Sequence, residues 1–169
     1  DTRHPWEREA AAGEPESPPP SERPSNIVNY ADVEPLVVRA ASDRDLGRTA
    51  GSERTGLCHV ALEPGKKGAP HHCHSAEEEI FVVLEGGGTL YLGDDEAPVR
   101  AGHVVGRPPG TGVAHSFRAG DNGLTYLAYG TREPNDIAYY PNSNKVNFRG
   151  IKLIGRIERL DYWDGEPED

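Results

Sequence analysis

Short apolar runs separated by Gly, Pro, Asn and Asp make up the chain from Ile27 onwards, at a spacing of about 8 to 12 residues. This spacing is typical of antiparallel strands joined by turns. The 3.6-residue period of an amphipathic helix is nearly absent from this stretch. The pattern therefore predicts an all-β sandwich or barrel, with strands at residues 57–62, 80–84, 89–92, 104–105, 114–117 and 124–129.

Turns are expected where Gly, Pro, Asn and Asp cluster between these runs, because these residues favour the backbone angles that tight turns require. The clusters are Pro64-Gly65, Gly86-Gly87-Gly88, Asp94-Asp95, Pro108-Pro109-Gly110 and Asp121-Asn122-Gly123.

The segment 80–84 is apolar at every position, with the sequence Ile-Phe-Val-Val-Leu. A strand of a two-sheet barrel needs apolar residues only on its inward face, so the outward face of this strand needs a cover of its own. The N-terminal arm, the C-terminal extension or a second subunit could supply that cover. We favour the second subunit and expect a homodimer.

The two ends of the chain differ from its centre. Residues 1–26 contain no Leu, Ile, Val or Phe and are rich in Pro and Glu, so we expect a disordered or arm-like segment. Residues 131–169 carry enough spaced apolar residues to pack on the barrel as a C-terminal extension. The predicted barrel spans residues 27–130, and a chain of 169 residues fits one domain.

Composition and charge narrow the choice of partners. The net charge is −10 and the basic residues are scattered, so the chain lacks the basic stripe that binds phosphates, and nucleic acid is not an expected partner. No apolar run reaches the roughly 18 residues of a membrane helix, and we expect no membrane partner.

Two further features bear on the setting of the protein. Cys58 and Cys73 lack CxxC spacing, which indicates free thiols and a cytoplasmic location, with a single disulfide as the alternative. Because the sequence contains no Met, we expect it to be part of a longer reading frame.

Three histidines, His71, His72 and His74, lie shortly before the apolar segment 80–84. In an extended chain, positions two apart share a face. His72 and His74 can therefore direct their imidazoles to one point, while Cys73 faces the other way. This geometry suits a single metal ion.

Two more residues could complete such a site. Glu79 begins the next predicted strand and shares a face with Phe81, and His115 begins a later strand after the turn at Pro108-Pro109-Gly110. Imidazole nitrogens with one carboxylate suit one divalent transition metal: Fe, Mn, Zn, Ni or Cu. Neutral histidine is the form that binds metal. The affinity of the site for the metal should therefore fall as the pH drops through the range in which histidine takes up a proton.

The spacing around these residues resembles the first motif of the cupin superfamily: Gly, five residues, His-x-His, three or four residues, Glu, six residues, Gly. Here six residues separate Gly65 from His72-Cys73-His74, four precede Glu79, and six more lead to Gly86. The first spacer is one residue longer than in the family, and the remainder fits.

A second stretch resembles the family's second motif: Gly, five residues, Pro-x-Gly, two residues, His, three residues, Asn. Gly102 is followed by five residues and Pro108-Pro109-Gly110, as in the family. Four residues then precede His115, and Ala119 stands where the family has Asn. The resemblance covers residues 57–129, with its motifs in 65–86 and 102–115.

The resemblance implies a cupin jelly-roll barrel, a double-stranded β-helix, and frequent dimers. It also implies one metal held by three histidines and one glutamate, which here are His72, His74, Glu79 and His115. The stretch Asp161–Glu166, Asp-Tyr-Trp-Asp-Gly-Glu, is similar to the tails of uncharacterised bacterial cupins, a match that brings no assigned reaction.

We therefore expect a small organic molecule to bind beside the metal. The function would be that of a metal-dependent oxidoreductase, dioxygenase-like, or of an isomerase that polarises a carbonyl. The alternative is a binding or sensing module without turnover, as part of a longer protein. Fold analogy alone does not decide between them.

Other polar residues have simpler interpretations. Glu77 and Glu78 are expected to form a solvated face, and Cys73 to be an inert buried or half-buried thiol. The remaining histidines are expected to be surface or locally hydrogen-bonded groups: His4, His59, His71 and His103.

Overall fold

The structure is a computed structural model that describes residues 24–167. The arm expected at residues 1–26 therefore lies almost wholly outside the described residues. Antiparallel strands dominate, in the order β1 (Leu36–Val38), β2 (Ala41–Asp45), β3 (Thr55–Leu62), β4 (Cys73–His74), β5 (Glu79–Leu92), β6 (Asp95–Arg100), β7 (Val104–Arg107), β8 (His115–Thr131), β9 (Ile137–Tyr140), β10 (Lys145–Phe148) and β11 (Leu153–Arg156). One short helix, α2 (Leu46–Thr49), and three single turns of 3-10 helix, Tyr30–Asp32, Pro141–Ser143 and Arg149–Ile151, complete the elements.

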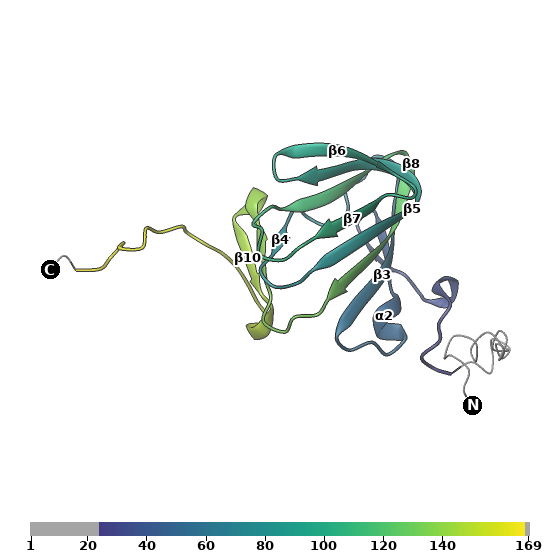
Figure 1. The fold of residues 1–169 in the computed structure, drawn as a ribbon, viewed down its shortest axis with the longest axis horizontal. Coiled ribbons are helices and arrows are strands. Elements are labelled where there is room, and N and C mark those ends of the chain that lie inside the picture. Colours follow the sequence, from purple (N-terminus) through teal and green to yellow (C-terminus); the bar gives the residue numbers. More distant parts are fainter. Residues whose placement is uncertain (1–23, 168–169) are drawn as a thin grey trace, which may run out of the picture.

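The strands form two sheets, and the smaller one, which contains β10, lies at one side of the larger one (Figure 1). The larger has seven strands in the order β1-β2-β3-β8-β5-β6, with β7 also paired to β5, and the smaller has the order β11-β10-β9-β4. The all-β architecture predicted from the sequence is confirmed. No helix among residues 24–167 is long and apolar enough to cross a membrane.

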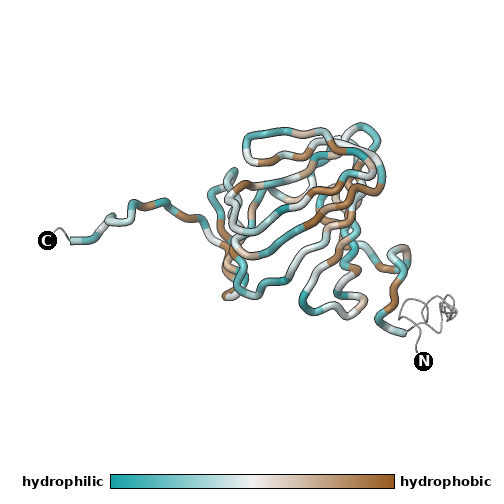
Figure 2. Tube along the Cα trace, in the orientation of Figure 1, coloured by the Kyte–Doolittle hydropathy of each residue, from teal (hydrophilic) through white to brown (hydrophobic). Residues whose placement is uncertain are grey.

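The core lies inside the larger sheet and is formed by the inward residues of β3, β5, β6 and β8. Phe81, Val83 and Phe117 are buried, and within each strand they alternate with residues of the other face. The rings of Phe81, Phe117 and Tyr126 pack with centroids 5.0 to 5.9 Å apart. Figure 2 shows the same concentration of hydrophobic residues along the barrel strands.

Two of the predicted turns are wrong, because residues 86–88 and 121–123 lie inside the long strands β5 and β8. The pairing of these strands shifts register at Val83/Glu85 and at Gly86/Gly88, which marks β-bulges. Glycine is needed here for close approach: a Cβ on Gly88 would lie 2.0 Å from the backbone oxygen of Arg118, and one on Gly86 2.2 Å from that of Gly123. The glycines therefore bend the strands instead of ending them.

The outward face of β5 is only partly covered by the described residues. Ile80 and Leu84 remain 37% and 40% exposed. The N-terminal segment reaches this side of the barrel at Tyr30, whose ring stacks on His59 at 4.8 Å. Within residues 24–167, the apolar outer face thus keeps room for a further contact.

The segment after the barrel forms most of the smaller sheet. β9 pairs with β4 through Cys73↔Tyr139 and His74↔Ala138, so the strand that carries His74 is held by residues from the C-terminal extension. Beyond β11 the chain extends away from the barrel (Figure 1). The extension is consequently part of the framework around the histidines.

Candidate metal centre

The site lies where the two sheets meet, at one end of the barrel. His72 and His115 form an isolated antiparallel bridge, in which the amide of His72 donates to the carbonyl of His115 at 3.1 Å and the reverse bond measures 2.7 Å. Residues directly opposite each other in such a pair project to the same side. Their rings are accordingly 4.7 Å apart, and the ring of His74 is 4.9 Å from that of His72.

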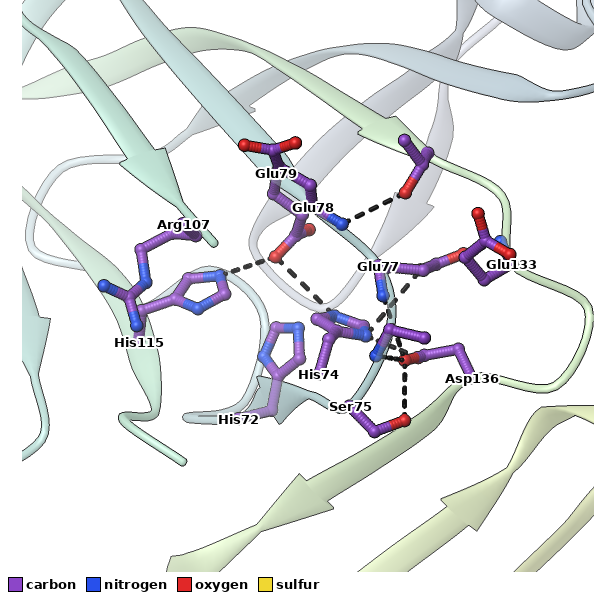
Figure 3. A network of polar contacts seen from close by, with 12 residues as sticks. His72, His74, Ser75, Glu77, Glu78, Glu79, Arg107, His115, Glu133 and Asp136 are labelled. Atoms are coloured by element: carbon purple, nitrogen blue, oxygen red, sulfur yellow. Dashed lines mark hydrogen bonds and ion pairs between the residues drawn. The ribbon is translucent and has the colours of Figure 1, made fainter. Parts of the chain in front are cut away.

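Glu79 reaches the same point from the first residue of β5. Its Oε2 lies 3.1 Å from Nε2 of His115 and 3.6 Å from Nε2 of His74. Figure 3 shows the carboxylate facing the three imidazoles. The structure thus brings together all four residues that the sequence singled out.

The protonation of two histidines follows from their hydrogen bonds. Nδ1 of His74 lies 2.6 Å from Oδ2 of Asp136, and Nδ1 of His72 lies 2.6 Å from the carbonyl oxygen of Pro70. A carbonyl or a carboxylate can only accept, so each Nδ1 carries the proton. In the neutral ring, Nε2 then keeps its lone pair and is the atom that can bind a metal.

The donor atoms fit a metal ion. Nε2 of His74 and Oε2 of Glu79 are buried and have no hydrogen-bond partner among the described residues, a costly state for polar atoms. One ligand atom each from His72, His74 and Glu79 lies within 4.8 Å of the others. Atoms bound to one ion at about 2.0–2.2 Å lie up to roughly 4.4 Å apart, so small side-chain movements would allow them to share it.

Burial and neighbouring charges set the protonation of the centre. Burial, with a smaller contribution from His115, lowers the pKa of His72 to about 4, so this ring is neutral at pH 7. Burial alone would raise the pKa of Glu79, but its contact with His115 and the other nearby imidazoles outweigh burial and lower it. At neutral pH the site therefore offers a carboxylate and at least one neutral imidazole.

Asp136 supports His74 and is itself almost fully buried, at 1% exposure. Besides His74, it accepts bonds from the amides of Ala76 at 2.9 Å and Glu77 at 3.2 Å, and from the hydroxyl of Ser75 at 3.3 Å. Burial opposes ionisation of Asp136, but these bonds prevail and lower its pKa. A charged acceptor therefore fixes the orientation of the His74 ring.

The expectation that Glu77 lies on a solvated face is wrong. Glu77 is only 6% exposed and pairs with both terminal nitrogens of Arg149, with one distance of 2.7 Å. Its other contacts include the amide of Glu133, at 3.1 Å. Burial raises the pKa of Glu77 despite Arg149. Although Glu77, His74 and Asp136 also form a group of possible ligands, Arg149 already neutralises that side.

The other polar residues lie outside the centre. His71 contacts the hydroxyl of Ser116 at 3.1 Å, and Nδ1 of His103 accepts the amide of Arg100 at 3.3 Å. His4 lies outside the described residues. Cys58 and Cys73 are free thiols, and burial raises the pKa of both, to about 12 for Cys58.

The match to known proteins agrees with this architecture. The family model of the cupin domain matches residues 58–128, a range that contains all four candidate ligands. A solved structure of a candidate sugar phosphate isomerase from Acidithiobacillus ferrooxidans is similar, with a TM-score of 0.68 and 28% identity over 80% of this chain and 98% of that one. Residues 58–128 form a cupin domain.

Two other solved structures resemble this cupin. A sugar phosphate isomerase of the cupin superfamily from Silicibacter pomeroyi has a TM-score of 0.69 and 25% identity, over 85% of this chain and 96% of that one. The polyketide cyclase RemF from Streptomyces resistomycificus has a TM-score of 0.55 and 28% identity, over 63% and 79%. Comparison with curated proteins gave no significant match.

The residues that support the centre were not found from the sequence. Asp136 and Arg149 lie beyond the matched range, in the extension of this cupin. No sequence motif connects either residue to the histidines. Asp136 contacts His74 and Arg149 contacts Glu77, and the partners lie about 60 to 75 residues apart in the sequence. They come together only when the extension folds back and β9 pairs with β4.

Proposed function

We propose that this cupin binds one divalent transition metal through His72, His74, Glu79 and His115, and that a small organic molecule binds to the metal. The observation that carries the proposal is the buried Nε2 of His74, which has no hydrogen-bond partner among the described residues and faces Oε2 of Glu79 at 3.6 Å. The same carboxylate oxygen lies 3.1 Å from Nε2 of His115. Leaving the lone pair of His74 unpaired is costly, and a cation between these atoms would satisfy it.

The protein's own residues prepare this site in three ways. Asp136 keeps the proton on Nδ1 of His74, so that Nε2 is available. Phe81, whose ring centroid is 5.3 Å from that of His115, and Phe117 beside it form an apolar floor that excludes water. A bound metal would supply Lewis-acid or redox chemistry to an oxygen-bearing ligand.

The geometry supports an oxidative, dioxygenase-like reaction best. Isomerisation requires a protein group that moves a proton between carbons, whereas oxygen chemistry depends on the metal and on a dry site. Two of the carboxylates nearest the centre are already engaged, Glu77 by Arg149 and Asp136 by His74, and Glu79 is a proposed ligand. No carboxylate at the centre is thus left as a free base among the described residues.

A second candidate, an isomerase that acts on a sugar phosphate or a similar carbonyl compound, is favoured by the comparisons. Both similar structures with a TM-score near 0.7 are named for this activity, one of them as a candidate. For this reaction a ligand residue or a group on the substrate would have to transfer the proton.

One experiment separates these reactions. The protein is loaded anaerobically with Fe(II), mixed with small diols and keto acids, and then exposed to oxygen, while oxygen uptake is recorded. Parallel samples with Mn(II) receive sugar phosphates and are followed by NMR. His72→Ala should abolish turnover in either assay, and the matched control His71→Ala, at the neighbouring histidine outside the centre, should retain it.

Each result has a defined meaning. Oxygen uptake that requires both Fe(II) and His72 supports the oxidative reaction, and conversion of a sugar phosphate without oxygen supports the isomerase. A ligand that binds to the loaded protein and is recovered unchanged supports a binding module instead. Equal activity in His72→Ala and His71→Ala would contradict the proposed ligand set.

We also propose that two chains associate through the outer face of β5. The apolar side chains of Ile80 and Leu84 support this, because a second chain would remove them from water. Light scattering should show a dimer for the native protein and a monomer for Leu84→Glu. A monomeric native protein would contradict it. The free thiols Cys58 and Cys73 are consistent with a reducing, cytoplasmic setting.

A further inference from the structure

We propose that Arg107 binds the anionic group of the molecule held at the metal centre, so that the ligand is a small oxyanion, either a carboxylate or a phosphate. This inference rests on the proposed metal centre and adds the class of its ligand. It assigns a function to a residue that stands at a variable position of the second cupin motif.

The position of Arg107 places it next to a proposed ligand. It is the last residue of β7, and in the pairing of β7 with β5 it lies directly opposite Glu79. Residues opposite each other in an antiparallel pair project from the same face of the sheet. Figure 3 shows the guanidinium beside His115, on the side of the centre away from Asp136.

The hydrogen bonds of Arg107 leave part of its binding capacity free. One terminal nitrogen donates to the carbonyl of Val113 at 2.6 Å and to the hydroxyl of Thr111 at 3.4 Å. The Nε atom is buried and has no hydrogen-bond partner among the described residues. Within residues 24–167, no carboxylate lies within 4.0 Å of this guanidinium, in contrast to Arg149, which pairs with Glu77. A buried donor of a cation without a counter-charge is costly, and an oxyanion would satisfy it.

A small cavity lies between Arg107 and the metal ligands. It has a volume of about 10 Å³, enough for one water-sized group, is partly open to solvent and is lined by Arg107, Thr111 and Val113 on one side and by His74, Glu79 and His115 on the other. One oxygen atom of a metal-bound oxyanion would fill this space, and the rest of the anion would lie at its open side, within reach of the guanidinium. Such two-point binding fixes the orientation of a small ligand.

The charge balance favours an anion. A divalent cation and Arg107 contribute three positive charges, and Glu79 is the one carboxylate among the four proposed ligands. Asp136 adds one negative charge behind His74, and the charges of Glu77 and Arg149 cancel. With neutral histidines, the local charge is therefore about +1. The planar guanidinium matches the oxygen geometry of carboxylates and phosphates, while a neutral molecule would leave it unpaired.

Arg107 could instead serve only to hold the loop of residues 108–113 through Val113 and Thr111. The two roles differ in a measurable way. A loop anchor would affect every ligand of the centre, whereas an anion-binding residue would affect anions alone.

The test is a calorimetric titration of Zn(II)-loaded protein with oxalate, with inorganic phosphate, and with imidazole as an uncharged metal ligand. We expect Arg107→Gln to lose about 10-fold or more in affinity for the anion that the native protein binds, while imidazole binding and zinc content stay unchanged. Arg107→Lys keeps the positive charge but not the paired N–H donors of the guanidinium, and its affinity for the anion should fall less. Arg100→Gln, at an exposed position of β6, is the matched control and should behave as the native protein.

The outcomes separate this inference from the proposed function. If the native protein binds no zinc, the metal centre itself fails. If it binds zinc and imidazole but neither anion, or if Arg107→Gln and Arg107→Lys both bind anions as tightly as the native protein, the inference is overturned and the centre stands. An equal loss for imidazole would show a loop anchor and also overturn it. The anion that binds more tightly distinguishes a carboxylate from a phosphate.

Discussion

The interior of the barrel has an apolar half and a polar half, and the same two strands build both. Along β5 the inward residues are Glu79, Phe81 and Val83, and along β8 they begin with His115 and Phe117. One alternating pattern thus passes from proposed metal ligands to hydrophobic core within two residues. The backbone scaffold is shared, and only the side chains differ.

The two halves depend on different partners. The apolar half is stabilised by contacts within the barrel, between side chains such as Phe81, Phe117 and Tyr126. The polar half depends on residues of the C-terminal extension, where Asp136 orients His74 and Arg149 neutralises Glu77. Changes in the core should therefore reduce folding stability, and changes in the extension should reduce metal affinity.

The largest effect on stability is expected from Leu124→Ala, at a side chain in the apolar half that is only 1% exposed. The cavity it leaves should lower the free energy of unfolding by about 2–5 kcal/mol. Denaturant unfolding measures this, and the folded variant should bind metal in the native ratio. Leu160→Ala, at an exposed position of the tail, is the control and should change stability little. Loss of metal binding in folded Leu124→Ala would show that the halves are not separable.

The next effect concerns the polar half. Asp136→Asn keeps an acceptor for the surrounding amides but removes the charge that holds the proton on His74. Metal affinity should fall by about 10–100-fold, as is typical for the partner of a metal-bound histidine. Competition with a chelator measures the affinity, and Asp121→Asn, at an exposed position of β8, should leave it unchanged. Unchanged affinity in Asp136→Asn would remove the link between the extension and the centre.

A smaller effect is expected from pH on the metal-free protein. His72 has a pKa of about 4 in the folded protein, against an ordinary value of 6.5 in the unfolded chain. Between pH 6.5 and 4, His72 therefore binds a proton in the unfolded chain but not in the folded protein. Stability should therefore fall between pH 6.5 and 4. The lowered pKa values of Glu79 and Asp136 act in the same direction at lower pH.

Denaturant unfolding of the metal-free protein at a series of pH values between 7.5 and 4 measures this dependence. His72→Gln should flatten it, because the substituted residue does not titrate, whereas His103→Gln should not. Constant or rising stability of the native protein towards pH 4 would contradict the assignment of a neutral, buried His72.

The sequence predicts the two halves of the interior to different extents. The segment 80–84 is apolar on both faces, so the inward positions of Phe81 and Val83 follow from Glu79: side chains two apart in a strand share a face, and strand periodicity is local. The four proposed ligands follow from spacing within motifs. Asp136 carries no such signal, since it meets His74 only after 62 residues of chain have folded back.

The errors in the predicted strands have a related cause. The glycines of residues 86–88 and 121–123 look like turns, but in the structure they allow β5 and β8 to approach closely at their bulges. A glycine can either form a turn or allow two strands to approach closely. The outcome depends on which strand lies beside it, and a single sequence does not reveal the pairing of strands. Strands β1 and β2 were not predicted, because β2 has the polar sequence Ala-Ser-Asp-Arg-Asp.

The central claim is that one transition metal occupies the polar half of the interior, and elemental analysis of protein purified without added metal tests it most directly. The native protein and the control His103→Ala should contain the same transition metal at the same ratio to protein. His74→Ala, verified to be folded by a cooperative melting transition, should contain little or none. Equal metal content in folded His74→Ala and the native protein would contradict the account.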